Sequence, residues 1–178
     1  MALKSTIFKA ELNIADLDRA YFGEHALTIA RHPSETDERM MVRVLAFALY
    51  GAPDLSFGKG ISNDDEPALW EIDPGSIIRR WVEVGQPDEE RIRKACARAE
   101  AVTVLTYGAR SADVWWQQTR DKLTRFNNLT VLRITAEEGA ALAALAERSM
   151  RLACTIQEGT VYLEGCELSP QILMAPAA

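Results

Sequence analysis

Two acidic segments are the residues best placed to do chemistry. The first is Asp64-Asp65-Glu66, which precedes a short apolar run, and the second is Glu83, which lies inside the next apolar run. The turn Asp73-Pro74-Gly75 separates the runs and predicts a hairpin. Such a hairpin brings two carboxylates to one sheet edge. Because Mg²⁺ is bound by one or two carboxylates together with water and substrate phosphate, Asp65 and Glu83 are candidate metal ligands for phosphodiester hydrolysis.

The surroundings of Glu83 make it the more informative acid. In a strand, Glu83 shares a face with Ile77 and Trp81, whereas Val82 and Val84 point to the other face. A carboxylate between apolar neighbours is costly to bury without a partner or a metal ion. The alternative is that Glu83 lies at a solvated strand end or pairs with an arginine.

Glu38 is a third candidate. On the helix expected around it, Glu38 is in line with the apolar stripe that should face the core, which is Met41, Val42, Leu45 and Leu49. An acid at the start of that stripe points inward or to the rim of a cavity. The alternative is a first-turn acid that stabilises the helix dipole by about 0.3–1 kcal/mol.

The concentrated basic region comes after Glu83. Arg91, Lys94 and Arg98 line one face of a predicted helix, and could contact phosphates beside the metal. The alternative is a solvated face of i, i+4 pairs, such as Glu90–Lys94. The net charge of −6 and the pI near 5.0 argue against avid nonspecific binding to nucleic acid, so any such binding must use a local patch.

The elements that must position these residues alternate between strands and helices. From 77 to 149 the order is strand, helix, strand, helix, strand, helix, which favours parallel crossovers. Hairpins before and after it predict a single α/β domain with one mixed sheet flanked by helices. Ser34 is expected to cap the first helix. The expected elements are strands 6–14 and 20–30, helix 33–50, strands 68–72 and 77–84, helix 87–99, strand 102–107, helix 112–125, strand 129–135, helix 136–149, and strands 152–157 and 160–163.

Length and composition are typical of a soluble globular domain. The chain has 178 residues, with 48% hydrophobic and 26% charged, which fits one core and excludes a disordered chain. The first residues lack a signal-peptide pattern, and no run reaches the ~20 apolar residues of a membrane span. Cys96, Cys154 and Cys166 have no metal-ligand spacing. We therefore expect reduced thiols, a cytoplasmic location and no membrane association.

Longer stretches around the acids resemble the YaeQ family. The resemblance lies in 81–89 running into 91–96, in 65–70, and in 34–41 leading into 45–47. It implies a compact variant of the PD-(D/E)XK, or restriction-endonuclease-like, fold over 1–174, with 175–178 as a disordered tail. It also implies a site for Mg²⁺, or alternatively Mn²⁺, made by Asp65 or Glu66 with Glu83 and Glu38.

One position departs from the nuclease motif, which has a lysine two residues after the acid. Here Gly85 stands in that place, and Gln86 and Lys94 are the candidate substitutes. The leading hypothesis is a Mg²⁺-dependent nuclease-like phosphodiesterase. Its catalytic residues would be Asp65, Glu83, Gln86 and Lys94, with Arg91 and Lys94 binding phosphate. The alternative is a catalytically inactive module that binds nucleic acid or protein on the same fold.

Overall fold

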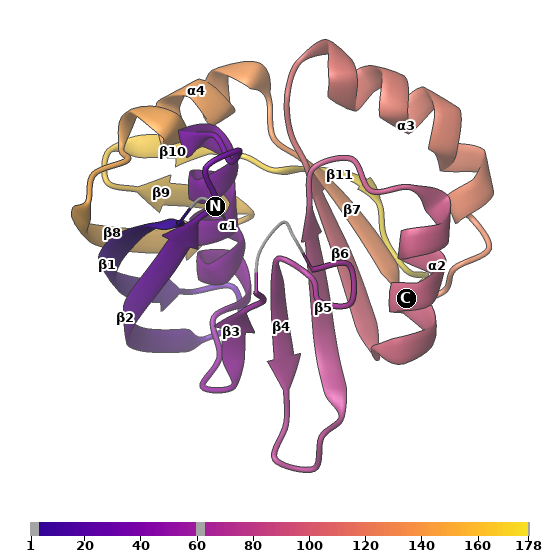
Figure 1. Cartoon of the computed structure of the whole chain (residues 1–178), viewed down its shortest axis with the longest axis horizontal. Coiled ribbons are helices and arrows are strands. Elements are labelled where there is room, and N and C mark those ends of the chain that lie inside the picture. The colour runs from indigo at the N-terminus through magenta and orange to yellow at the C-terminus, as the bar shows by residue number, and fades with distance from the viewer. Residues whose placement is uncertain (1–3, 60–62, 178) are drawn as a thin grey trace.

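The computed structural model describes residues 4–59 and 63–177 and shows an α/β domain with two mixed sheets and four helices (Figure 1). Residues 60–62, within the predicted loop 58–67, and residue 178 of the predicted tail lie outside the described part. The helices are α1 (Asp37–Tyr50), α2 (Glu89–Arg98), α3 (Arg110–Leu123) and α4 (Ala136–Ala144). The strands are β1 (Thr6–Asp16), β2 (Tyr21–Arg31), β3 (Leu55–Phe57), β4 (Leu69–Ile72), β5 (Ile78–Val84), β6 (Ala101–Thr106), β7 (Leu129–Arg133), β8 (Ser149–Gln157), β9 (Thr160–Leu163), β10 (Cys166–Leu168) and β11 (Gln171–Met174).

The five-stranded sheet has the order β10-β9-β8-β1-β2. Strand β1 lies between β2 and β8. It pairs antiparallel with β2, where Leu12 lies opposite His25, and parallel with β8, where Leu12 lies opposite Leu152. Buried and exposed residues alternate along β1 and β8. This alternation means that one face of the sheet packs on the core and the other meets solvent.

The six-stranded sheet has the order β11-β7-β6-β5-β4-β3 and positions the candidate site. Strands β5, β6 and β7 are parallel neighbours, and the chain crosses between them through α2 and α3. Apolar residues of α2 and α3, including Ile92 and Trp115, pack on one face of these strands against Val102 and Val131. The other face packs on α1, so strands β5 to β7 are apolar on both sides, as parallel strands usually are.

The prediction of one mixed sheet was wrong, because β8 pairs with β1 and not with β7. The pattern of β8 explains this pairing. Leu152, Cys154 and Ile156 are buried and alternate with exposed residues, so β8 suits a sheet with one solvated face. Strands β5 to β7, in contrast, have apolar residues on both faces, and both faces must be buried. Helix α4 connects β7 of one sheet to β8 of the other.

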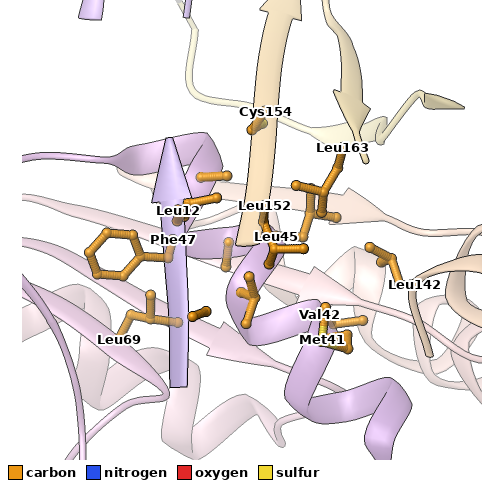
Figure 2. Close-up of a cluster of buried hydrophobic side chains, with 14 of the residues drawn as sticks. Leu12, Met41, Val42, Leu45, Phe47, Leu69, Leu142, Leu152, Cys154 and Leu163 are labelled. Carbon is orange, nitrogen blue, oxygen red and sulfur yellow. The ribbon is translucent and has the colours of Figure 1, made fainter. Parts of the chain in front are cut away.

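Helix α1 lies between the two sheets and forms the centre of the main core. Every residue from Met40 to Ala48 is buried, and Arg43 is the single charged one among them. Figure 2 shows side chains of α1, such as Leu45 and Phe47, near Leu12 and Leu152 of the five-stranded sheet and Leu69 of the six-stranded sheet. The layers are therefore sheet, α1, sheet, and finally α2 with α3.

Local boundaries differ from the prediction in three ways. Thr36, not Ser34, caps α1, because its hydroxyl accepts from the backbone of Arg39. Helix α4 ends at Ala144, since the following residues turn into β8 and do not continue the helix to 149. The short strands β3, β10 and β11 were not predicted. In the described ranges 4–59 and 63–177, no helix has the length and apolarity needed to cross a membrane.

Candidate functional site

A pocket of about 230 Å³ opens where β5 ends, next to the loop that precedes β4. This is the carboxyl end of a parallel strand, where open α/β sheets commonly bind ligands. Five of its eleven lining residues are charged, and these come from α1, the loop, β5 and α2. The pocket is lined by Arg39, Arg43, Asn63, Glu66, Pro67, Ala68, Glu83, Val84, Gln86, Pro87 and Arg91.

Glu83 is the buried acid of this pocket, with a relative exposure of 5%. Its Oε1 accepts both from Trp81 Nε1, at 2.7 Å, and from Arg91 Nε, at 2.8 Å. Within residues 4–59 and 63–177 its Oε2 accepts no hydrogen bond, and the side chain lines the pocket. Trp81 and Glu83 lie on the same face of β5, as predicted. The ion pair of Glu83 with Arg91 corresponds to the alternative that the sequence left open, in which Glu83 pairs with an arginine.

Burial raises the pKa of the Glu83 carboxyl above its ordinary value of 4.5. The hydrogen bond from Trp81 and the positive charges of Arg91 and Arg39 act against this rise, because they favour the ionised form. A buried acid with a perturbed pKa in a pocket is a marker of functional sites.

Arg91 connects the helix after β5 to the loop before β4. Besides Glu83, its guanidinium donates to the carbonyl of Asp64 at 3.0 Å and to the carbonyl of Glu66 at 2.9 Å. Arg98, two turns further along α2, donates to the carbonyl of Asp65 at 3.0 Å. Three successive loop carbonyls are thus held by two arginines from one helix face, which fixes the path of the loop past the pocket.

The loop acids point in different directions. Glu66 lines the pocket, and its Oε2 accepts from the backbone of Lys59 at 2.8 Å. Asp65 is exposed and does not line the pocket, while its backbone N–H donates to Asn63 Oδ1. Of the two neighbours that the sequence offered as the partner of Glu83, the structure brings Glu66 to the pocket.

Helix α1 contributes arginines, which sequence reasoning missed. Glu35 is buried, and its carboxylate binds Arg43 through Nε at 2.9 Å and Nη2 at 2.5 Å, and also binds Arg39. This network holds Arg39 and Arg43 at the pocket wall. A buried position for Arg43 could have been suspected, because it lies within an otherwise apolar helix.

Gly85 and Gln86 shape the end of β5. Gly85 has a φ of 109°, a conformation that L-residues with a side chain rarely adopt, and its N–H donates to the carbonyl of Leu105. This backbone gives a physical reason for glycine at this position. The amide nitrogen of Gln86 donates to Thr106 Oγ1 and to the carbonyl of Tyr107, which directs the side chain over the end of β6.

Two predicted site residues lie away from the pocket. Glu38 is half-buried and packs against α4, where a Cβ added to Gly139 would lie 2.2 Å from its Oε1. Lys94 is exposed and pairs with Glu90, with 3.2 Å between Nζ and Oε1. The structure therefore gathers Glu83, Gln86 and Arg91, and it leaves Asp65, Glu38 and Lys94 outside the pocket lining.

The donor set can be tested against a magnesium ion. In the described part of the chain, no group of three or more His, Cys, Asp or Glu side chains is arranged to hold a metal ion. Two carboxylates, Glu66 and Glu83, do line the pocket. One or two carboxylates with water and phosphate are the usual ligands of Mg²⁺, so this smaller set fits such an ion.

The fold and pocket define an α/β protein with a charged pocket at the carboxyl end of a parallel strand. The family model described as YaeQ protein matches residues 1–172, so the chain belongs to the YaeQ family. It is 48% identical over 163 residues to the uncharacterized protein YaeQ of Escherichia coli K12, covering 92% of this chain and 90% of that one. The same identity and coverage hold for the YaeQ protein of Salmonella typhi.

Solved structures share the whole fold. The crystal structure of YaeQ from Xanthomonas axonopodis pv. citri matches with a TM-score of 0.92 and 44% identity, covering 97% of this chain and 99% of that chain. The YaeQ structure from Pseudomonas syringae also has a TM-score of 0.92, with 38% identity and coverage of 96% and 97%.

Proposed function

We propose that the pocket at the end of β5 is the site of a metal-dependent phosphodiesterase that acts on nucleic acid. The observation that carries the proposal is the joint presence of two carboxylates, from Glu66 and Glu83, and three guanidinium groups around one opening; the guanidinium groups belong to Arg39, Arg43 and Arg91. Mg²⁺ or Mn²⁺ held by the carboxylates would polarise a phosphoryl oxygen and stabilise the leaving oxygen. The restriction-endonuclease-like core implied by the resemblance belongs to this proposal.

In this proposal the side chains of the pocket have different roles: metal binding, phosphate binding and positioning of the nucleophilic water. Glu83 would offer its Oε2, which accepts no hydrogen bond from residues 4–59 or 63–177, whereas its Oε1 is occupied by Trp81 and Arg91. Arg91 and Arg39 would bind the phosphate, because guanidinium groups pair well with phosphate oxygens. Gln86 uses its nitrogen internally, so its Oε1 remains to accept from a nucleophilic water. Asp65 and Lys94 would take part only if the loop and the side chains moved, because neither lines the pocket.

A second candidate function is a catalytically inactive module that binds nucleic acid. The observation in its favour is that Arg91 already pairs with Glu83, while the place of the motif lysine is taken by Gly85 and Lys94 pairs with Glu90. Here Arg39 and Arg91 would bind phosphate without any metal. Such binding would be insensitive to EDTA and would weaken with rising salt.

The experiment compares the wild type with Glu83→Gln, and uses Glu90→Gln as a matched control on the surface of α2. Titration calorimetry with Mg²⁺ and Mn²⁺ measures metal binding. Cleavage is then measured on single- and double-stranded DNA and RNA, with each metal and with EDTA.

The phosphodiesterase predicts metal-dependent cleavage that Glu83→Gln lowers by about 100-fold or more and Glu90→Gln leaves within about twofold. Absence of both metal binding and cleavage in the folded wild type would contradict it. Retention of nucleic-acid binding in EDTA, lost on Arg91→Ala, would instead support the binding module.

A further inference from the structure

Strand β2 forms one edge of the five-stranded sheet. The backbone N–H of Lys9 donates to the carbonyl of Arg148, so the odd residues of β1 direct their backbone groups to β8 and the even residues to β2. In the antiparallel register with β1, the odd residues of β2 then face β1 and the even ones face outward. The hydrogen bond from Arg43 Nη2 to the carbonyl of Ala30, at 3.1 Å, agrees with this assignment.

The outward edge of β2 is long and open. The backbone groups of Phe22, Glu24, Ala26 and Thr28 have no hydrogen-bond partner on that side within residues 4–59 and 63–177. The register with β1 runs unbroken over eleven residues, without proline, lysine or bulge. Proteins usually protect such an edge with one of those features, because an unpaired edge is a template for another strand. The opposite edge, β10, has only three residues.

We propose that two copies of this chain pair through β2 and join their sheets into one. Antiparallel pairing with full overlap places Tyr21 opposite the partner's Arg31 and Ala26 opposite the partner's Ala26. In this register the outward-facing residues at 24, 26 and 28 of one copy meet outward-facing residues of the other, as hydrogen-bonded pairs require, while the carbonyl of Ala30 keeps its hydrogen bond from Arg43. The two-fold axis then passes between the Ala26 residues, which gives the self-complementary contact of a symmetric dimer.

Charge complementarity on the solvated face supports this register. Glu24 falls opposite the partner's Thr28, and in each copy Thr28 lies opposite Lys9 of β1. The side chain of Glu24 therefore lies in one row with the partner's Lys9, two strand spacings or about 10 Å away, which two long side chains can span. Pairing centred on Glu24 would instead place two carboxylates face to face.

Apolar residues on the same face also match. Phe22 is 64% exposed and Ile7 is 42% exposed, which is high for side chains of this size. In the full-overlap register Phe22 falls opposite the partner's Ala30, and Ala30 lies opposite Ile7 within each copy. Both apolar side chains thus enter one row, with the small Ala30 leaving room for the Phe22 ring. Ile7 of one copy and Phe22 of the other, each exposed in the single chain, would thus share one apolar contact in the dimer.

The first test uses cross-linking at the two-fold axis. Cα atoms of a hydrogen-bonded antiparallel pair are about 5.5 Å apart, within the range of a disulfide. Ala26→Cys is expected to form an interchain disulfide on mild oxidation, seen as a dimer on non-reducing gels. Thr28→Cys is the matched control, because the two Thr28 residues would lie about 14 Å apart. Equal cross-linking of the two variants, or none in either, would overturn the proposal.

The second test measures how substitutions change the affinity of the dimer. Sedimentation velocity from low to high protein concentration gives this affinity. Glu24→Lys and Lys9→Glu are each expected to weaken the dimer about 5- to 30-fold, and the double variant to restore it, because the opposite charges are again paired. Ala26→Pro removes an outward N–H and should abolish the dimer, while the N–H groups that bond β1 are kept. Circular dichroism checks the fold of each variant. A wild type that stays monomeric, or a dimer that ignores Ala26→Pro, would refute β2 pairing.

Discussion

Glu83 combines a costly location with a specific set of partners. A carboxylate this buried needs compensation, and it receives two hydrogen bonds on one oxygen, from Trp81 and Arg91. Burial raises the pKa of this carboxyl, and the hydrogen bonds from Trp81 and Arg91 act in the opposite direction. Among the residues that the structure describes, none donates a hydrogen bond to the second oxygen, and a metal ligand or a proton acceptor requires such an oxygen.

The pH dependence of the free energy of unfolding should show the raised pKa of Glu83. Because the pKa of Glu83 is higher in the folded protein, the folded state binds more protons than the unfolded state in the window above pH 4.5. Stability therefore falls as pH rises through that window. Glu83→Gln lacks this titration, so the stability of the wild type relative to the variant should decrease from pH 4.5 upward. Urea unfolding at a series of pH values measures this difference.

Glu90→Gln is the control for that series, because Glu90 is exposed on α2. Its stability relative to the wild type should change little over the same pH range. A constant difference between the wild type and Glu83→Gln would show that Glu83 titrates at its ordinary pKa.

At the scale of elements, the sequence was most informative where patterning is strong. The apolar runs of β5, β6 and β7 and the helices between them were predicted within a few residues. Periodicity does not state which strands pair, so the division into two sheets was missed. Strands β3, β10 and β11 have only three or four residues, too few for a periodic signal.

The same limit applies to the candidate site. The local pattern identified Glu83, and strand alternation gave its face. The approach of Arg39 and Arg43 from α1 depends on how α1 packs between the sheets, which no local pattern encodes. The choice between Asp65 and Glu66 depends on hydrogen bonds from Arg91 and Arg98 to the loop carbonyls. These contacts are distant in sequence.

The turn at the end of β5 allows a direct test of the missing lysine. Gly85→Lys would place a lysine where the proposed nuclease motif expects one, but the φ of 109° strains any side-chain-bearing residue there. We expect a loss of about 1–3 kcal/mol in the free energy of unfolding and no gain of nuclease activity. Chemical denaturation and the cleavage assay measure the two effects.

Gln86→Lys provides the comparison, since Gln86 is exposed and its backbone is not in the left-handed region. It should cost less stability than Gly85→Lys. A fully stable Gly85→Lys protein would show that the turn tolerates a side chain.

At the scale of the whole molecule, α1 makes the two sheets one folding unit. Its buried residues contact strands of both sheets, and a single core cluster includes residues of both (Figure 2). A domain that shares its central helix in this way is expected to unfold in one cooperative step.

Leu45→Ala should test this coupling. Leu45 is fully buried in α1, so its truncation is expected to cost about 2–5 kcal/mol. All four tryptophans pack with the cluster between the six-stranded sheet and helices α2 and α3, so their fluorescence reports that part. Far-UV circular dichroism reports the whole chain. Both signals should shift together to lower urea concentration, and separated transitions would argue against a shared unit.

The position of β1 between β2 and β8 has a consequence for synthesis on the ribosome. The β1–β2 hairpin can form as soon as it emerges, but Ser149, the partner of Lys9, follows 140 residues later (149 − 9 = 140). At translation rates of roughly 5–20 residues per second, β1 waits about 7–30 s for its second neighbour. During that time the edge of β1 that β8 later covers has no neighbouring strand. The pairing of β8 with β1 is therefore one of the last folding steps. Before it occurs, the unpaired edge of β1 in the nascent chain is a site that a chaperone would protect.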